Sequence, residues 1–487
     1  MKKIIPLMMI ICLLLPSCQL KKSDYSYDFT TIPEHTTASF FSKEESETFL
    51  SETESSTADI SESATITLSP SVSSTRNNQA VSSTKTASKT TTQPTTKKLS
   101  TTTKATTVKT TVSTTKPPVS DNEFRGIWIS CYDYTSAAGK NRTQYKATTD
   151  EMFRNIRDCG LNTAFVHLRA FSDAFYESDI YPYSAYIAGK EGADLPFDPF
   201  EVLLESANKY GISVHGWINP FRVSTKNDVS LLSGGNPAKK IIDSGNKNGE
   251  ICILSNGIYY NPSCTENHAR ILDGVREIIT KYDIDGIHID DYFYPSTDEK
   301  VDKTQYSEYK SEGGKLSLSE WRKANVNSFV SALYSTVKAH DSSLTVSISP
   351  SAKLDENENK LYADVKLWLS KKGYADVIIP QIYFGFDHET HGFEKLLKQW
   401  GNLPRNPDVK LICGIAAYKC ATADKYAGKG KTEWQENSDI LARQTECIKK
   451  NSAYDGFVVF SYQDLTRNGC KNEISNLKNT VKTGKNQ

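Results

Sequence analysis

Eight short apolar runs recur along the second part of the chain, and stretches of helical period separate most of them. The runs begin at positions 125, 163, 213, 285, 344, 376, 410 and 455, and they read RGIWIS, TAFVHLRA, SVHGWINP, DGIHIDDY, LTVSISP, DVIIPQIY, KLICGIAAY and DGFVVFSY. Short apolar runs that alternate with helices are typical of βα units with parallel strands. Eight such units are what a closed barrel needs. The pattern therefore predicts an α/β fold, a TIM-type (β/α)8 barrel over residues 122–487.

Signals for helix boundaries stand between the runs. Asp198 and Pro199 suit the N-cap and first turn of a helix that Gly211 would end. Asn261 and Pro262 predict a similar start for a later helix. A doubly wound open sheet is the competing α/β architecture, but it would need a glycine-rich phosphate turn after its first strand, and RGIWISCYDY has none. We therefore favour the barrel.

The chain before the first run has a different character. Two lysines precede an apolar run that ends in LPSC and is too short to span a bilayer. This pattern predicts a lipoprotein signal peptide over residues 1–18 with Cys18 as the lipidated residue, and an ordinary cleaved secretory signal is the alternative. Residues 19–121 are dominated by Ser and Thr, which predicts a disordered tether. We expect an exported protein, held to the membrane through a lipid anchor at Cys18 and facing the cell wall.

Charge and cysteine content narrow the list of partners. The 58 basic residues balance the 58 acidic residues, so bulk electrostatics indicates no nucleic-acid partner. Cys12 and Cys18 belong to the signal, and the other eight of the ten cysteines show no C-x-x-C spacing. Buried free thiols are therefore at least as well supported as disulfide bridges. We expect no cofactor.

Alternation along each strand divides the side chains into two faces. Ile287 and Ile289 share one face of the fourth strand, which leaves His288 and Asp290 on the other. The isoleucines belong under the helices, so the second face points into the barrel. The same alternation gives more inward residues, namely Trp128, Ser130, His167, Arg169, His215, Trp217, Asn219, Tyr292, Ser347, Ser349, Gln381 and Tyr383. Barrel interiors are normally filled by branched apolar residues, so this polar and aromatic set predicts a ligand site, although each member alone is more often structural.

Asp290 is the first candidate for catalysis. It stands where the fourth strand reaches the C-terminal face, a position that suits a carboxylate attacking or stabilising an oxocarbenium-like sugar centre. Asp291 should point away unless the chain turns there, and Asp387, after the sixth strand, is the second candidate for the acid. Aromatic rings that can stack on sugars, and polar groups that can bind their hydroxyls, give the candidate substrate-binding set. Its members are Trp128, Arg169, His215, Trp217, Asn219, His288, Tyr292, Phe293, Gln381 and Tyr383.

Five motifs occur in the order FRGIWIS, GISVHGWINPFRV, DGIHIDDYFYP, VSISPS and DVIIPQIYFGF, and they span nearly the whole folded region. In this combination the chain resembles the glycosyl-hydrolase-like family ten of bacterial envelope proteins. The resemblance implies a TIM-type barrel that acts on glycan, with peptidoglycan as the expected polymer for a tethered, wall-facing protein. The family's acidic tandem and tyrosine match Asp290, Asp291 and Tyr292. Its W-x-N-P-Y/F-R turn matches Trp217, Asn219, Pro220, Phe221 and Arg222, which adds Arg222 to the substrate-binding candidates.

Other mechanisms and functions stay open at this point. Family-18 chitinases carry D-G-x-D-x-D-x-E on this strand, and Tyr292 stands where their general acid would be, so substrate-assisted cleavage lacks its acid here. His215, His288, Asp290 and Asp291 are the donors that a metal-dependent polysaccharide deacetylase would use, but no H-x-x-x-H or H-E-x-x-H spacing supports that reading. A glycan-binding barrel without turnover is the alternative outside enzymology.

Overall fold

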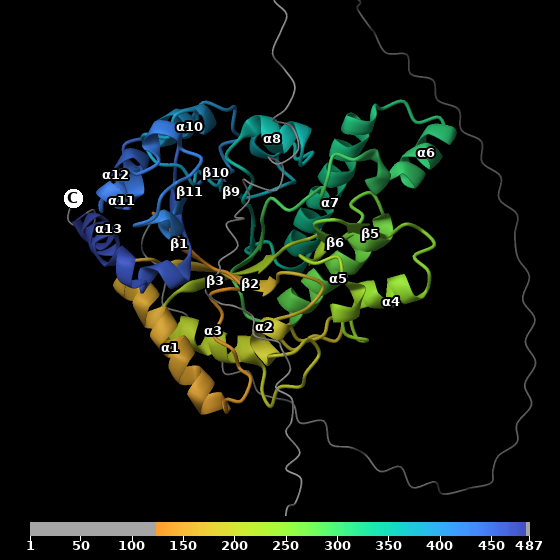
Figure 1. Ribbon diagram of the computed structural model, residues 1–487, viewed down its shortest axis with the longest axis horizontal. Coiled ribbons are helices and arrows are strands. Elements are labelled where there is room, and N and C mark those ends of the chain that lie inside the picture. The colour runs from red at the N-terminus through yellow and green to blue at the C-terminus, as the bar shows by residue number, and fades with distance from the viewer. Residues whose placement is uncertain (1–122, 484–487) are drawn as a thin grey trace, which may run out of the picture. The chain divides into compact units, whose positions relative to one another are not determined.

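The structure is a computed structural model, and it describes residues 123–483 (Figure 1). The predicted signal peptide over residues 1–18, its lipidation at Cys18 and the predicted tether over residues 19–121 lie outside the described residues. Within the described part, no helix combines the length and the apolar character needed to cross a membrane.

The parallel strands close into a barrel of eight positions, two short strands sharing one of them. They are β1 (Phe124–Ile129), β2 (Thr163–Arg169), β3 (Ser213–Ile218), β7 (Gly286–Ile289), β8 (Thr345–Ile348), β9 (Val377–Ile378), β10 (Lys410–Leu411), β11 (Cys413–Ala416) and β12 (Gly456–Phe460). The consecutive β10 and β11 act as one strand that closes the barrel, because β10 pairs with β9 and β11 pairs with β12. Each position coincides with one of the eight apolar runs. The predicted fold class is therefore confirmed.

Helices surround the strands in chain order, from α1 through α3, α5 and α7 to α12 and α13 (Figure 1). The helices are α1 (Arg142–Asp158), α2 (Ala185–Ala188), α3 (Pro199–Tyr210), α4 (Pro237–Asp243), α5 (Thr265–Lys281), α6 (Lys303–Ser311), α7 (Leu318–His340), α8 (Leu354–Asn359), α9 (Val365–Ser370), α10 (Phe393–Gly401), α11 (Glu433–Glu436), α12 (Ile440–Lys449) and α13 (Lys471–Thr483). Asp198 caps α3, and Gly211 ends it in the left-handed conformation, as predicted. The start predicted for α5 was wrong. This helix begins at Thr265 because the Asn261 side chain instead holds the preceding turn.

A small antiparallel sheet, which the periodicity did not predict, is inserted between β3 and α5. It consists of β4 (Arg222–Ser224), β6 (Gly257–Tyr260) and β5 (Ile251–Leu254), in that spatial order. Figure 1 shows β5 and β6 close to α4 and α5, across the view from α12 and α13. Because β4 begins only four residues after β3 ends, the insertion fixes the position of Arg222 next to the C-terminal end of that strand.

Two apolar cores follow the predicted alternation. Outward residues such as Ile287 and Ile289 pack with the helices in the larger core. The barrel interior holds the second core, made of Trp128, Phe165, Trp217, Val377, Ile379, Tyr383, Ile412, Ala416 and Val458. The alternation fails at one place, where the pairing register of β2 shifts between His167 and Arg169. As a result Arg169 pairs with Ile218, whose side chain belongs to the outer core.

The cysteines of the described residues carry free thiols. Seven of these eight are buried, and Cys447 is half-buried. Their environment agrees with buried thiols that act as small apolar side chains.

Gly286 offers a test of how tightly β7 is held. A Cβ at this position would lie 2.3 Å from the backbone oxygen of Thr345 and 2.9 Å from Nδ1 of His215. We expect Gly286→Ala to lower the free energy of unfolding by about 1–3 kcal/mol, because the neighbouring strand must shift. Gly234→Ala is the control, since a Cβ there meets no atom within 4 Å. Urea unfolding of both variants checks this, and equal stability would contradict it.

Candidate active site

Asp290 and Asp291 lie directly after β7, at the C-terminal mouth of the barrel. Both side chains are buried, with 3% and 5% of their surface exposed. The chain turns here, because the amide of Phe293 donates a hydrogen bond to the carbonyl of Asp291 (2.9 Å) and the amide of Tyr292 donates to Oδ1 of Asp290 (3.3 Å). The turn that Asp291 needed in order to join the site is therefore present.

Burial raises the pKa of both carboxyl groups. For Asp290, burial and then the negative charge of Asp291 raise the pKa well above its usual 3.8. For Asp291, burial raises the pKa to about 7, although the side chain of Gln381 acts in the opposite direction. Neighbouring buried carboxyl groups titrate as a pair, since the first charge opposes the second. The pair is therefore set to hold a proton near neutral pH.

Trp217 of β3 contacts Asp290, and His167 of β2 and Asn219, which follows β3, support that indole from behind. The indole Nε1 of Trp217 donates to Oδ2 of Asp290 (3.3 Å), and its ring stacks on His167 with centroids 3.7 Å apart. The amide of Cys131 donates to Nδ1 of His167 (3.2 Å), so the ring proton sits on Nε2 and is donated to Oδ1 of Asn219 (3.0 Å). Because His167 covers one face of the Trp217 ring, we assign Trp217 to positioning Asp290 rather than to stacking on a sugar.

Another group of predicted residues lies deeper in the barrel. Nε1 of Trp128 donates to Nε2 of His288 (3.1 Å), which leaves the proton of this ring on Nδ1, donated to Oγ of Ser347 (2.9 Å). His215 packs edge-on against Phe165 (5.1 Å), one pleat below. Both nitrogens of His288 are thus engaged by protein. Within the described residues, no group of three or more His, Cys, Asp or Glu side chains is placed to hold a metal ion.

Three other predicted side chains interact electrostatically with the aspartate pair, Arg222 at the start of β4 and Gln381 and Tyr383 after β9. The positive charge of Arg222 lowers the pKa of both Asp290 and Asp291, and Gln381 lowers that of Asp291. Burial, and after it the nearby negative charges, raise the pKa of the Tyr383 hydroxyl well above its usual value. The structure therefore brings these three predicted residues to the mouth.

Glu356 is a member of the site that sequence reasoning missed. It lies on α8, is 7% exposed, and its negative charge raises the pKa of Asp291. Oγ of Ser351 donates to Oε2 of Glu356 (2.7 Å), and Nζ of Lys353 lies 3.6 Å from the same oxygen. In the sequence Glu356 stands in the acidic run LDENEN, which resembles a solvated helix start. The sequence offered one indication of its role, which is that α8 follows β8, a strand whose serines were predicted to point inward.

Three predicted residues have other surroundings. Asp387 is exposed on the loop after β9, where its backbone amide donates to Oε2 of Glu433 (3.0 Å). The guanidinium of Arg169 donates to two backbone carbonyls (3.2 and 2.9 Å), a structural role that follows from the register shift in β2. Phe293 packs against Trp368 in the outer core (5.4 Å) rather than facing the mouth.

Two buried polar atoms at the mouth have no hydrogen-bond partner among the described residues. They are Oδ1 of Asp291 and Oγ of Ser349. Gln381 lies at both, because its amide donates to the carbonyl of Ser349 (2.9 Å) and its side chain acts on the pKa of Asp291. An unpaired buried polar atom costs about 1–3 kcal/mol. Such atoms, gathered at a barrel mouth, indicate a place that a ligand completes.

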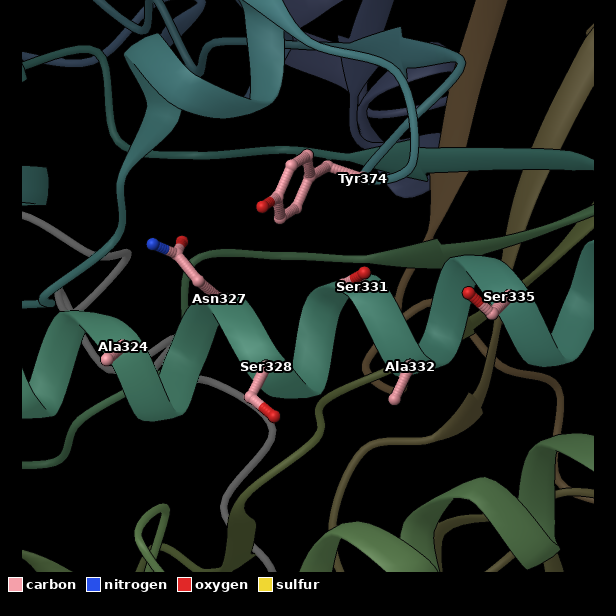
Figure 2. Close-up of a pocket in the computed structure, with 7 residues that line it drawn as sticks. All are labelled: Ala324, Asn327, Ser328, Ser331, Ala332, Ser335 and Tyr374. Carbon is pink, nitrogen blue, oxygen red and sulfur yellow. The ribbon is translucent and has the colours of Figure 1, made fainter. Parts of the chain in front are cut away.

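A groove on the outer surface of the barrel is a less suitable site. Figure 2 shows its lining residues, which are Ala324, Asn327, Ser328, Ser331, Ala332, Ser335 and Tyr374. Most of them are small side chains of α7, and Oδ1 of Asn327 already accepts a hydrogen bond from Nε1 of Trp368 (2.7 Å). Tyr374 precedes β9, so the groove lies toward the N-terminal ends of the strands. The lining contains no carboxylate or histidine, and we assign no chemistry to it.

Known proteins resemble this chain over most of the barrel. Residues 123–432 match the family described as Glycosyl hydrolase-like 10. The chain is 31% identical over 380 residues to Glycosyl hydrolase YngK of Bacillus subtilis (strain 168), covering 73% of this chain and 72% of that protein. It is 26% identical over 410 residues to Glycosyl hydrolase DigH of Escherichia coli (strain K12), covering 75% and 89%. Among solved structures, the catalytic domain of a β-amylase from Paenibacillus polymyxa aligns with a TM-score of 0.46 at 11% identity, covering 75% of this chain and 99% of that one.

The raised pKa of Asp291 predicts how stability changes with pH. The pKa of Asp291 is about 7 in the folded chain, whereas the usual aspartate value of 3.8 applies to the unfolded chain. Between these two values the folded chain therefore holds a proton that the unfolded chain has released. The free energy of unfolding should therefore fall as pH rises from 4 to 7. Asp291→Asn removes this loss of stability. At pH 8 the free energy of unfolding of the variant should therefore exceed that of the wild type by up to about 4 kcal/mol, and at pH 4 it should not.

Urea unfolding at both pH values measures the effect. Asp387→Asn is the control, because this exposed carboxylate should leave the pH dependence of stability as it is. A stability difference between wild type and Asp291→Asn that is equal at pH 4 and pH 8 would contradict the prediction.

Proposed function

The chain belongs to the glycosyl hydrolase-like 10 family, and on that premise we propose that it is a glycoside hydrolase that cleaves cell-wall glycan, with peptidoglycan as the polymer. The observation that carries the proposal is the buried pair of Asp290 and Asp291 at the barrel mouth, whose raised pKa values keep a proton available near neutral pH. Glycosidic cleavage needs a proton donor for the leaving oxygen and a carboxylate that attacks or stabilises the sugar cation. A pair in which one carboxyl group is protonated and the other is charged supplies both groups.

Their surroundings assign the two roles. Asp290 accepts hydrogen bonds on both of its oxygens, from the amide of Tyr292 and from Nε1 of Trp217. N–H donors favour the charged form of a carboxyl group. Oδ1 of Asp291 has no hydrogen-bond partner among the described residues and is free to face a substrate. We therefore assign the charged role to Asp290, which strand alternation in the sequence also favoured, and proton donation to Asp291.

Glu356 is our candidate for a third carboxyl group in the reaction. Its charge acts on Asp291, whereas Asp387 is exposed and makes its described contact through its backbone amide. A third carboxylate beside the pair can activate the water that completes hydrolysis. Glu356 thus takes the place that the sequence had suggested for Asp387.

Incubation of the purified protein with peptide-free peptidoglycan glycan strands tests the reaction. We expect chains that become shorter, read by mass spectrometry, because hydrolysis breaks the sugar–sugar bond. Chains of unchanged length that lose acetyl mass would indicate a deacetylase. Unchanged strands that nonetheless bind would indicate a glycan-binding barrel, and either of these results would contradict the proposal.

Single substitutions test the assigned roles. Asp290→Asn and Asp291→Asn should each lower kcat by at least about 10³-fold, equivalent to roughly 4 kcal/mol of barrier. Glycan binding should persist in both variants, because the amide keeps the shape of the side chain. Glu356→Gln should lower kcat more than Asp387→Asn does. The opposite order for this second pair would restore Asp387 as the catalytic group.

We also propose export and lipid anchoring at Cys18, which the N-terminal sequence pattern supports. Cys18→Ala should move the protein from the membrane fraction to the soluble fraction, because the acyl chains would be its anchor. Cys12→Ala is a matched control within the same signal and should remain with the membrane. Continued membrane partition of Cys18→Ala would rule out the anchor.

A further inference from the structure

We propose that the barrel mouth contains a subsite for a sugar unit that carries a carboxylate, with Arg222 binding the carboxylate and Tyr132 contacting the sugar ring. The inference rests on the proposed function, because it names a substrate class for the same mouth. The contacts of Arg222, the charge around it and the exposed aromatic ring beside it carry the argument.

Aromatic rings hold the guanidinium of Arg222. Its central carbon lies over the ring of Tyr292 (4.5 Å) and over the ring of Phe171 (5.0 Å). Such contacts fix the guanidinium through the ring faces and leave its N–H groups available as donors. Burial raises the pKa of the Tyr132 hydroxyl, and the positive charge of Arg222 acts in the opposite direction. Within residues 123–483, no carboxylate forms an ion pair with this arginine.

Arg222 is half-buried, and its side chain has no carboxylate partner among the described residues. The fully buried arginines of the described part have their donors occupied. Arg322, for example, binds both carboxylate oxygens of Asp302 (2.8 and 2.6 Å). The charge of Arg222 acts on the aspartate pair, in which a raised pKa keeps a proton near neutral pH, so the pair supplies less than its full charge. The planar fork of an arginine binds a carboxylate through two parallel hydrogen bonds. A carboxylate on the substrate would complete this site.

Tyr132 provides the surface for the sugar itself. It follows β1, and 48% of its surface is exposed, which is rare for an aromatic side chain in this structure. Its ring stands edge-on to Tyr186 (5.7 Å), and Tyr186 in turn stacks near Phe171 (6.1 Å). An exposed ring that is held by other rings gives a fixed apolar surface, as sugar-binding sites use. Because the guanidinium of Arg222 also lies over Phe171, this aromatic cluster places the ring of Tyr132 near the carboxylate position.

The subsite adjoins the place of bond cleavage. The charge of Arg222 acts on both Asp290 and Asp291, and Tyr292, which lies under the guanidinium, is the residue that follows them in the chain. A sugar held by Arg222 is therefore next to the bond that would be cut. Recognition at this position should influence kcat/KM and not only overall binding.

Paired substrates separate this role from others. Peptide-free peptidoglycan glycan strands carry a carboxylate on the lactyl group of alternate sugars, and carbodiimide coupling to methylamine converts these groups to neutral amides of similar size. For the wild type we expect kcat/KM to be at least tenfold higher on the acidic strands than on the amidated strands. Arg222→Gln should bring this ratio close to one, and Arg222→Lys should give an intermediate ratio because it keeps the charge without the fork.

Arg443→Gln is the matched control. Arg443 also lies over an aromatic ring, that of Phe386 (4.4 Å), but it is on α12 and 43% of its side chain is exposed. This variant should keep the substrate ratio of the wild type.

Two outcomes would overturn the subsite. One is a wild-type ratio near one. The other is an Arg222→Gln variant that loses the same factor on both strands and shifts the pH profile, which would mean that Arg222 only adjusts the aspartates.

Binding of the same strands, measured by calorimetry, keeps the two proposals distinguishable. If the wild type cleaves neither strand, the proposed hydrolysis fails. The subsite is then still supported if the wild type binds acidic strands at least tenfold more tightly than amidated strands and Arg222→Gln does not. Equal binding of both strands by the wild type would overturn it.

Discussion

Two neighbouring carboxyl groups are buried at the barrel mouth, and the side chains around them offset the cost of that burial. A charged group removed from water is costly unless it is paired or bonded. Asp290 and Asp291 meet that cost by keeping a proton, which is why the pKa of each is raised. Three neighbouring side chains lower these pKa values again, so that one carboxyl group of the pair can carry a negative charge. They are Arg222, Gln381 and the indole of Trp217. The same balance that makes the pair reactive makes it a weak point for stability.

Two uncharged histidine rings, rather than charged groups, lie beneath the aspartate pair in the barrel. His167 and His288 each accept a hydrogen bond on one nitrogen and donate from the other, so both are held in the uncharged form. Burial lowers the pKa of both rings well below the usual value, which is consistent with that assignment. A second positive charge this deep in the barrel would lower the pKa of both aspartates and favour loss of their protons. The interior therefore fixes Trp217 and Asp290 in position without adding charge.

Much of the barrel and part of its site followed from strand alternation. Ile287 and Ile289 mark the outer face of β7, and burial of those two side chains alone determines that Asp290 faces inward. Alternation failed where the backbone left the regular strand. A shift in β2 moved Arg169 outward, and a turn after β7 brought Asp291 into the mouth. Both depend on backbone hydrogen bonds to other segments, which the pattern of apolar residues does not encode.

Residues that reach the mouth from loops and helices were harder to find for a related reason. Glu356 stands on α8 in an acidic run, and Tyr132 follows β1 on a short turn, so neither belongs to a periodic pattern. Their roles come from tertiary contacts, such as the hydrogen bond that Ser351 donates to Glu356. Sequence reasoning could identify Arg222 only through a family resemblance, although the inserted sheet that begins with it explains why its position is fixed.

The proposed cleavage site and the proposed sugar subsite lie on different parts of the fold, which has a physical advantage. The aspartates follow a barrel strand whose neighbours on both sides hold it in register, so the reacting atoms stay within a narrow range of positions. Arg222 and Tyr132 instead lie on an inserted sheet and a turn, where changes leave the barrel core intact. Under the proposed function, changes at the rim would alter which sugars bind while the aspartate pair keeps its surroundings. The aspartates follow a barrel strand, whereas Arg222 lies on the inserted sheet at the rim. The proposed bond cleavage and the proposed choice of substrate can therefore change independently of each other.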